Sequence, residues 1–399
     1  MTPLSPDTVL FRTPRLELTL TGTLTVEIDA GDRKVVTSER ALAVLGAFAH
    51  PTSLGDALSR LAASGVEDWI DLSTSVLHLY EAGILRDASQ SLAFHDAEGF
   101  AAARVHIEML NDRVRTASFL AAISEVVRPG DVVVDIGTGT GVLAIGAAKA
   151  GAGRVYAVEE STIGESAKAM FDANHVADRV TLVAGRSSRV DLPERADVLV
   201  SEIIGNDIFD EAILEVVRDA RRRHLTPGAR LIPQKLRVFA LPLDVPRDEL
   251  GKQSFASADL AGWQSQYGIS FASLSATARG DLALRLPAQR TREWRRMGEP
   301  TLLAEIDLAG IERTDVEAQA TSVARETGNV SGFLVYFEAE LSAKVTLSMH
   351  PDRAGPDSSW TSRTTILPEP IPVVPGDRLR VRYAYCGRSY LEAERERVR

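Results

Sequence analysis

Two glutamates, Glu202 and Glu211, stand nine residues apart near the middle of the chain. Glu202 follows the apolar run Val198–Ser201, which is typical of a buried strand, and acids at the carboxyl edge of a parallel sheet lie where ligands bind. Two anions in a partly dry pocket bind a cation, and one of them can accept its proton. The pair is therefore a candidate catalytic site for chemistry on a cationic nitrogen. Alternatively, Glu202 only ends a strand and Glu211 belongs to the first turn of a helix, where the dipole favours acids.

A glycine-rich loop precedes this pair. It follows the apolar run Val132–Val134 and leads into a predicted helix. Glycine lets the backbone bend sharply and lets a ligand approach, and the start of a helix presents free N–H groups to that ligand. The residues of the loop that we expect to contact a cofactor are Asp135, Gly137, Thr138, Gly139 and Gly141.

A second strand, from Arg154, ends in Glu159, 18 residues beyond Gly141. A carboxylate at this place can accept both hydroxyls of a ribose. Asp135, directly before the loop, would repel a pyrophosphate, and the third glycine follows the second by two residues where the dinucleotide fingerprint has three. Both details favour S-adenosylmethionine (SAM) over a dinucleotide. The alternative is a structural strand–helix turn in another α/β fold.

The elements around these residues predict a chain of three parts. Residues 1–90 indicate a small α+β module, resembling a winged helix, with three strands followed by three helices. Residues 91–240 alternate strands and helices, which predicts a Rossmann-like α/β domain with a parallel sheet. Residues 241–399 indicate a β-barrel domain. Its predicted strands are Leu302–Leu308, Gly332–Leu341, Lys344–Met349, Arg363–Leu367 and Arg378–Tyr385.

The composition limits the class of protein. Hydrophobic residues make up 45% and charged residues 25% of 399 residues, as in globular proteins. No apolar run reaches the roughly 18 residues of a membrane span, and the N-terminus lacks the layout of a signal peptide. The single cysteine, Cys386, excludes an intrachain disulfide and a thiolate metal cluster. The net charge of −10 argues against nucleic acid. We expect a cytoplasmic protein with no metal, no nucleic-acid partner and no membrane contact.

The loop, the strand that ends in Glu159 and the glutamate pair together resemble the protein arginine methyltransferases, from about Phe100 to the C-terminus. This resemblance implies a class I SAM-dependent methyltransferase. The segment from His106 to Thr116 is similar to the family's segment that folds over the cofactor. It implies that Arg115 pairs with the methionyl carboxylate and that Met109 packs near the transferable methyl group. Glu202 and Glu211 resemble the glutamates that bind the substrate guanidinium.

Three features differ from that family. Its Thr-His-Trp segment is Ser358-Ser359-Trp360 here, so the histidine that would pair with Asp112 is missing. Phe209 is the only ring left between the two glutamates. Ser187 and Ser188 stand near where the family has a glutamate on the adenine amine, although a hydroxyl can still bond there. The residues expected to contact the substrate are His106, Asp112, Asn206 and Trp360. We interpret the differences as a changed acceptor, an aliphatic amine.

Residues 1–90 resemble the recognition element of enzymes that modify ribosomally made peptides, which bind a leader peptide as an added strand. The sequence thus favours a SAM-dependent N-methyltransferase acting on a cationic nitrogen of a precursor peptide, as in daptide-type pathways. One alternative is a protein arginine N-methyltransferase. Another is a non-catalytic SAM-binding scaffold.

Residues 262–280 match the position of the family's dimerisation arm, and we expect a homodimer. Within this segment, Trp263, Tyr267 and Phe271 project from a stretch otherwise rich in small residues. An exposed aromatic arm needs a partner surface. The alternative is a barrel loop that folds back on its own chain.

Deleting residues 1–88 should leave SAM binding intact, because every predicted cofactor residue lies at or beyond Met109. If the module holds a peptide, the deletion should raise the KM for that peptide much more than it lowers kcat. Steady-state kinetics of the intact and truncated enzymes on a full-length peptide measure both. A truncated enzyme of equal efficiency would contradict the peptide-binding role and favour the arginine methyltransferase hypothesis.

Overall fold

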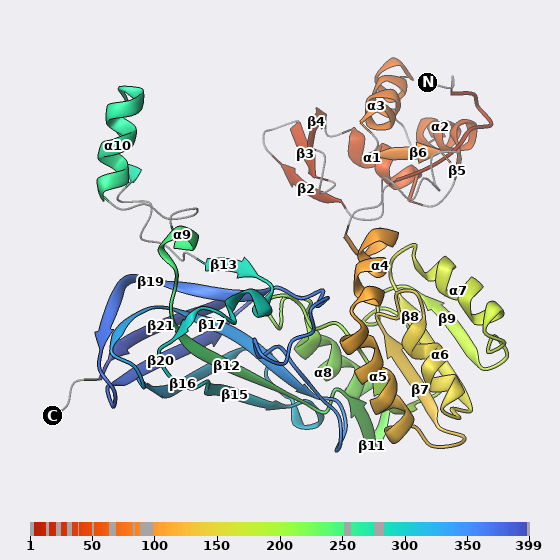
Figure 1. The fold of residues 1–399 in the computed structure, drawn as a ribbon. Helices are drawn as coiled ribbons and strands as arrows, with labels where there is room; N and C mark the ends of the chain where they lie inside the picture. Colours follow the sequence, from red (N-terminus) through yellow and green to blue (C-terminus); the bar gives the residue numbers. More distant parts are fainter. Residues whose placement is uncertain are drawn as a thin grey trace. The chain divides into compact units, whose positions relative to one another are not determined.

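The computed structural model of the protein describes residues 4–12, 16–20, 25–29, 34–38, 40–49, 52–63, 69–82, 84–87, 99–250, 257–274 and 283–396. The chain forms two compact units, Met1–Ala97 and Glu98–Arg399 (Figure 1). Each unit has its own hydrophobic core. The predicted boundary at residues 90 and 91 lies outside the described residues.

The N-terminal unit holds the three strands and three helices predicted from the sequence. The strands β2 (Glu17–Leu20), β3 (Thr25–Asp29) and β4 (Lys34–Ser38) form an antiparallel sheet. The helices are α1 (Ala41–Ala47), α2 (Leu54–Ala63) and α3 (Trp69–Glu81). A second small sheet, which the sequence did not predict, has the order β5 (Thr52–Ser53), β1 (Val9–Arg12), β6 (Leu85–Asp87).

Local sequence explains how this unit folds. The Ser53 hydroxyl accepts a hydrogen bond from the Asp56 N–H at 3.1 Å, so Ser53 caps the start of α2. Leu10 of β1, Phe48 after α1 and Leu72 of α3 are fully buried in one core. The unit therefore buries its apolar side chains within itself.

The second unit begins with a five-stranded parallel sheet in the order β11-β10-β7-β8-β9. Its strands are β7 (Val132–Ile136), β8 (Arg154–Glu159), β9 (Val180–Ala184), β10 (Ala196–Val200) and β11 (Leu225–Ile232). Its helices are α4 (Ala103–Asn111), α5 (Arg113–Val126), α6 (Val142–Lys149), α7 (Gly164–Ala173) and α8 (Ile213–Arg223). The predicted Rossmann-like domain is confirmed.

The order of the strands fixes where a ligand can bind. The chain runs outward from β7 through β8 to β9, then returns to the other side of β7 with β10 and β11. Ligands bind at such a switch point, beyond the carboxyl ends of the strands. Asp135 of β7 is paired with Val200 of β10. The glycine loop and Glu202 therefore leave the sheet side by side.

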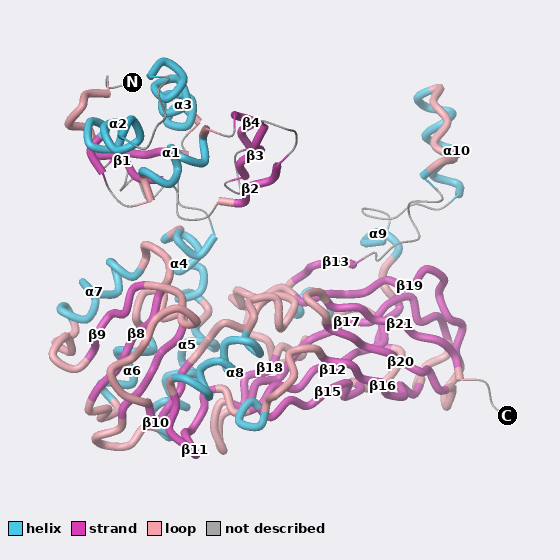
Figure 2. Tube along the Cα trace, turned by 180° about the vertical axis from the view of Figure 1, so that it is seen from behind, coloured by secondary structure: helices cyan, strands magenta, loops and turns pink. Residues whose placement is uncertain are grey.

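A β-barrel-like domain of antiparallel strands follows, as predicted (Figure 2). One sheet has the order β13-β19-β17-β12-β14, with β15 and β18 paired to it, and the other has the order β16-β20-β21. The strands are β12 (Lys235–Asp244), β13 (Ala283–Leu286), β14 (Arg295–Arg296), β15 (Thr301–Asp307), β16 (Val316–Val323), β17 (Gly328–Glu340), β18 (Thr346–Ser348), β19 (Ser362–Val373), β20 (Arg378–Tyr385) and β21 (Ser389–Arg395). The antiparallel strands thus begin at Lys235, before the predicted boundary at residue 241.

The parallel sheet and the antiparallel strands share one hydrophobic core. At their border the ring of Phe209, after β10, lies 5.1 Å from the ring of Tyr385 in β20. Arg221 of α8 also donates a hydrogen bond to the Ile311 carbonyl at 2.5 Å. The loop that carries the two glutamates is therefore packed against the barrel.

The predicted dimerisation arm begins within a helix. After α9 (Arg247–Leu250), α10 spans Ser257–Tyr267. The ring of Phe271 makes edge contacts with Trp263 at 5.8 Å and with Tyr267 at 6.3 Å. Tyr267 is 57% exposed. The part of the predicted arm beyond Leu274 lies outside the described residues.

Candidate active site

Asp135 closes β7 at the start of the glycine loop. It is 1% exposed, and its Oδ2 accepts a hydrogen bond from the Thr138 hydroxyl at 2.5 Å. Within the described part of the chain its Oδ1 has no hydrogen-bond partner. Burial raises the pKa of Asp135 to about 7. A buried carboxylate oxygen thus faces the loop and needs a donor or a cation.

The glycine loop turns on three glycines in the left-handed region. Gly137, Gly139 and Gly141 have φ values of 77°, 55° and 83°, which side chains disfavour. At Gly139 an added Cβ would also lie 2.8 Å from Cε1 of His106. Backbone conformation and close packing therefore both require glycine here.

Glu159, at the end of β8, holds the neighbouring backbone. Its Oε2 accepts the Gly139 N–H at 2.9 Å, and its Oε1 accepts the Ser161 N–H at 2.8 Å. Glu159 is 8% exposed. Each carboxylate oxygen can accept a further hydrogen bond. The acid predicted to bind a ribose therefore also shapes the loop beside it.

Helix α4 covers the glycine loop. His106 is buried, and its Nε2 lies 2.8 Å from the Phe100 carbonyl oxygen. The Ser161 hydroxyl donates to the same carbonyl at 3.4 Å. Met109 is half-buried on this helix. The structure places His106 against the glycine loop, and its predicted contact with the substrate stays a prediction.

Asp112 connects the start of α5 to a loop of the barrel. Its Oδ1 accepts the Arg115 N–H at 3.0 Å, which caps α5. Its Oδ2 accepts the Ser359 N–H at 3.0 Å and the Ser359 hydroxyl at 3.4 Å. Ser359 therefore takes the place of the missing histidine as a donor to Asp112. Serine cannot take up a proton at neutral pH, so this pair is structural.

Arg115 and Glu202 form a buried ion pair, with side chains 11% and 6% exposed. The Arg115 guanidinium also lies over the Trp360 ring, 5.2 Å from its centroid. Burial lowers the pKa of Arg115 to about 10, although the nearby charges of Asp112 and Glu211 favour the cation. Arg115, predicted to bind the cofactor, thus also contacts one of the two predicted catalytic acids.

Glu211 lies outside the helix that follows it. Helix α8 begins at Ile213, and Ala212 before it has a left-handed φ of 62°. The alternative that Glu211 is a first-turn helix residue is therefore wrong. Burial and the charge of Asp210 raise the pKa of Glu211 to about 7, whereas Arg115 lowers it. Such a carboxyl can change its protonation state near neutral pH.

The barrel holds the loop between the two glutamates. The Trp360 indole donates a hydrogen bond to the Ile204 carbonyl at 2.6 Å. The Thr361 N–H donates to Oδ1 of Asn206 at 2.7 Å. The Tyr385 hydroxyl donates to the Phe209 carbonyl at 2.8 Å. Asn206 and Trp360, predicted at the substrate, thus stand in contacts that position the loop.

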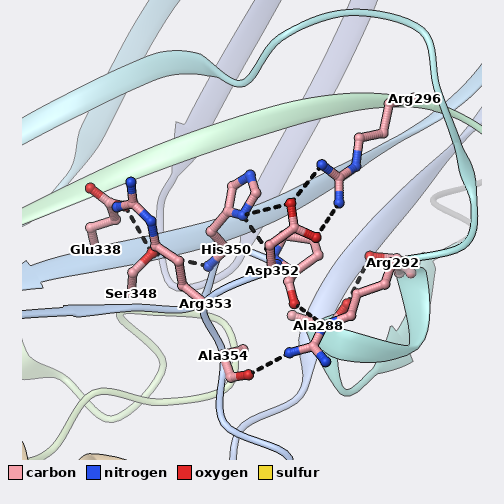
Figure 3. A network of polar contacts seen from close by, with 11 residues as sticks. Ala288, Arg292, Arg296, Glu338, Ser348, His350, Asp352, Arg353 and Ala354 are labelled. Atoms are coloured by element: carbon pink, nitrogen blue, oxygen red, sulfur yellow. Dashed lines mark hydrogen bonds and ion pairs between the residues drawn. The ribbon is translucent and has the colours of Figure 1, made fainter.

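A network of polar contacts anchors the segment that leads to Ser359 and Trp360 (Figure 3). Arg296 makes two hydrogen bonds to Asp352, at 2.6 and 2.8 Å. Arg292 donates to the carbonyl oxygens of Pro351 and Ala354 at 2.6 and 2.8 Å. Figure 3 shows the guanidinium of Arg296 directed at Asp352 and that of Arg292 directed at Ala354. The network fixes the turn at Asp352, seven residues before Ser359.

The predicted adenine contacts lie in the loop after β9. Ser187 is 8% exposed. Its carbonyl oxygen accepts a hydrogen bond from Arg223 at 2.7 Å and lies 3.0 Å from Nε2 of His224. Arg223 also reaches the carbonyl of Ser188 at 3.3 Å. The end of α8 therefore sets the path of this loop.

The sequence did not predict the residues that position the site through contacts between segments far apart in the chain. The contacts of Tyr385, Thr361, Arg296 and Arg223 join segments far apart in the chain. No spacing in the sequence signals such contacts. Among the described residues, no group of His, Cys, Asp and Glu could hold a metal ion, and no helix is long and apolar enough to cross a membrane.

Comparison with known proteins connects this geometry to a family. Residues 114–232 match the family model of the ribosomal protein L11 methyltransferase (PrmA). An arginine N(omega)-methyltransferase of Streptomyces achromogenes subsp. streptozoticus is 31% identical over 340 residues, which cover 84% of this chain and 90% of that protein. The protein arginine N-methyltransferase PRMT10 of Oryza sativa subsp. japonica is 30% identical over 305 residues, which cover 69% and 79%.

Two solved structures share the fold. The Trypanosoma brucei PRMT1 enzyme–prozyme heterotetrameric complex with AdoHcy matches with a TM-score of 0.64 and 22% identity, over 75% of this chain and 100% of that chain. Protein arginine methyltransferase 10 of Arabidopsis thaliana matches with a TM-score of 0.60 and 24% identity, over 71% and 88%. The chain is thus a SAM-dependent N-methyltransferase, and it belongs to the arginine N-methyltransferase family.

Proposed function

We propose that this enzyme transfers a methyl group from SAM to a guanidine nitrogen of arginine. The observation that carries the proposal is the convergence of Glu202 and Glu211 on Arg115 beside the Trp360 ring. Two carboxylates against one guanidinium leave a net negative charge. A second guanidinium, that of the substrate, would balance this charge.

The relatives support a guanidine acceptor over the amine that the sequence favoured. The Streptomyces relative is named for arginine, and the Oryza relative for protein arginine. The alignment with the Streptomyces protein covers a larger share of this chain than Glu98–Arg399 makes up, so it includes part of the N-terminal unit. An N-terminal unit is therefore compatible with methylation of arginine.

The residues of the cofactor site fit SAM. The orphaned Oδ1 of Asp135 would find a partner in the cofactor's ammonium group. Glu159 would accept hydrogen bonds from the ribose, since each of its oxygens keeps an unused acceptor position. Arg115 has five N–H donors and can hold the methionyl carboxylate while it contacts Glu202. Ser187 and Ser188 lie in the loop proposed for adenine.

The mechanism follows from the two acids. When bound, SAM supplies a methyl group on a positive sulfur that a nitrogen lone pair can attack. Glu202, held by Arg115, would orient the substrate guanidinium. Glu211, with its pKa near 7, would accept the proton that the nitrogen loses on methylation. The buried Trp360 covers one side of the site and excludes water.

Methylation of an amine in a precursor peptide remains the second candidate. The observation that favours it is the small antiparallel sheet β2-β3-β4, whose two edge strands could each pair with a peptide. The same observation supports residues 1–90 as a peptide-recognition module. The chemistry at Glu202 and Glu211 does not depend on this role.

We also propose that the enzyme is a homodimer formed through α10. Trp263 and Tyr267 of this helix form an aromatic cluster with Phe271 of the segment after it, and Tyr267 and Ile269 are 57% and 59% exposed. Exposed apolar groups in one segment mark a contact surface. The Trypanosoma structure is a heterotetrameric complex.

Replacing Glu159 with alanine should weaken SAM binding by about tenfold or more, because it removes charged hydrogen bonds to the ribose and frees Gly139. Calorimetry measures the affinity, and thermal unfolding checks the fold. Glu194→Ala is the matched control, since Glu194 is an exposed acid that pairs with Arg154 at the start of β8. Unchanged SAM affinity in a folded Glu159 variant would exclude the ribose contact.

The intact enzyme should methylate a guanidine nitrogen, and its rate should rise as the pH rises through about 7. Below that pH Glu211 is protonated, so it neither attracts the guanidinium nor accepts its proton. Glu211→Gln should lower kcat by roughly a hundredfold or more. Mass spectrometry of products from arginine and from arginine- and lysine-containing peptides locates the methyl group.

Glu305→Gln is the control for this experiment, because Glu305 is an exposed acid paired with Arg237 on the barrel. Methyl groups found only on amines would replace the proposal by the second candidate. An unchanged kcat in the Glu211 variant would remove Glu211 from the mechanism.

Replacing Trp263, Tyr267 and Phe271 together with alanine should convert a dimer into a monomer, because these side chains form the aromatic cluster of α10 and the segment after it. Light scattering at micromolar concentration measures the mass. The control replaces Gln264 and Gln266, exposed polar residues of the same helix. A wild-type enzyme that is monomeric at this concentration contradicts the proposal.

A further inference from the structure

A second charged cluster lies on the loop between the two catalytic acids. Asp207, 4% exposed, stands between two guanidinium groups. Arg285 of β13 and Arg363 of β19 each place a nitrogen 3.6 Å from its Oδ2. Both distances are longer than a hydrogen bond, so the two arginines neutralise Asp207 without using their donors on it.

The two arginines differ in how they meet solvent. Arg363 has a side chain 12% exposed, and its Nε has no hydrogen-bond partner within the described part of the chain. The Arg285 side chain is 48% exposed. Arg363 is therefore buried and stabilises the loop. The more exposed guanidinium of Arg285 can donate two hydrogen bonds to a carboxylate that binds from solvent.

Asp210 places an acid between this cluster and Glu211. A Cβ added to Gly205 would lie 1.6 Å from Oδ1 of Asp210 and 3.2 Å from Cγ of Glu211, so both side chains pack over the same glycine. Burial raises the pKa of Asp210, and the charge of Arg285 lowers it. Asp210 therefore lies beside the acid that we assign to the guanidinium, and the guanidinium of Arg285 lies against Asp207 of the same loop.

We propose that Asp210 and Arg285 bind the α-ammonium and the α-carboxylate of a free amino acid, so that the substrate of this enzyme is free arginine. The inference rests on the proposed function, because it takes the guanidinium of the same molecule to lie between Glu202 and Glu211. At the far end of the same molecule, the positive ammonium would meet Asp210 and the negative carboxylate would meet Arg285.

The chemistry of the two substrate classes separates them. Free arginine carries an ammonium and a carboxylate beyond the three methylene groups that follow its guanidinium. In an arginine within a polypeptide both groups are neutral amides, which form no ion pair with the Asp210 carboxylate or the Arg285 guanidinium. The charges of Asp210 and Arg285 would then be desolvated against neutral groups, at a cost in affinity.

The loop composition is consistent with this assignment. Between the two glutamates, Phe209 is the only aromatic residue, and its ring packs inward on Tyr385. Of the other residues of the loop, Ile204 and Ile208 are buried and Ile203 is half-buried, which leaves the polar side chains of Asn206 and Asp210 exposed. Charged hydrogen bonds and not aromatic packing are therefore what this loop offers to the part of the substrate beyond the guanidinium.

The test compares four acceptors on the full-length enzyme: L-arginine, agmatine, Nα-acetyl-L-arginine and an internal arginine in a neutral peptide. Agmatine lacks the carboxylate and Nα-acetyl-L-arginine lacks the ammonium. We expect KM to be lowest for L-arginine and about tenfold or more higher for each of the others, since each has lost a charged contact. Equal kcat/KM for L-arginine and the peptide would overturn the inference.

Two variants assign the contacts. Arg285→Gln should raise the KM for L-arginine about tenfold and leave the KM for agmatine unchanged. Asp210→Asn should raise the KM for L-arginine much more than that for Nα-acetyl-L-arginine, because any effect through the pKa of Glu211 is common to both acceptors. A variant that acts only through the shape of the loop would change kcat for all four acceptors alike, and that result would contradict the proposal. Arg154→Gln, an exposed arginine at the opposite edge of the parallel sheet, is the control.

The outcomes also separate this inference from the proposed function. Methylation of the peptide's guanidine group with no preference for L-arginine would keep the function and refute the subsite. Absence of guanidine methylation from all four acceptors would refute both.

Discussion

Arg115 meets Glu202 in a buried place where each charge needs the other as its partner. Taking an isolated ion out of water costs several kcal/mol, and only a partner in good geometry offsets that cost. The geometry comes from three directions: α5, capped by Asp112, supplies the arginine; β10 supplies the acid; and the barrel supplies the Trp360 ring. The ion pair therefore ties the position of the cofactor side to that of the acceptor side.

Sequence patterns predicted the elements that are local in the chain. The strand that contains Asp135 and the strand that ends in Glu159 are neighbours in one parallel sheet. Because they follow each other in the sequence, their spacing was enough to predict that Glu159 lies beside the glycine loop. The position of Glu202 at the carboxyl edge was predicted as well, whereas the pairing of β10 with β7 was not. The strands β13, β16 and β21 were not predicted. Nor were the contacts of Arg285, Arg363 and Tyr385 with the loop, because antiparallel pairing across long separations leaves no period in the sequence.

The missing histidine shows why a substitution needs its structural context. From the sequence, Ser359 suggested a damaged acceptor site and hence a different acceptor. In the structure its N–H and hydroxyl satisfy Asp112, so the connection between α5 and the barrel is intact. What changes is the proton chemistry, since this position holds no titratable group. Glu211, whose pKa is raised by burial and by Asp210, is a group suited to proton transfer.

The hydrogen bonds from Trp360, Thr361 and Tyr385 to the backbone and Asn206 of the glutamate loop have a consequence for how this enzyme could evolve. The barrel strands supply part of the wall of the reaction chamber, so they are not free to drift as a passive scaffold would be. A change of acceptor could begin in β13, β19 or β20, outside the parallel sheet, without touching the cofactor loop. Natural variation in those strands would then correlate with the acceptor that is methylated, whereas the glycine loop would vary only with the methyl donor.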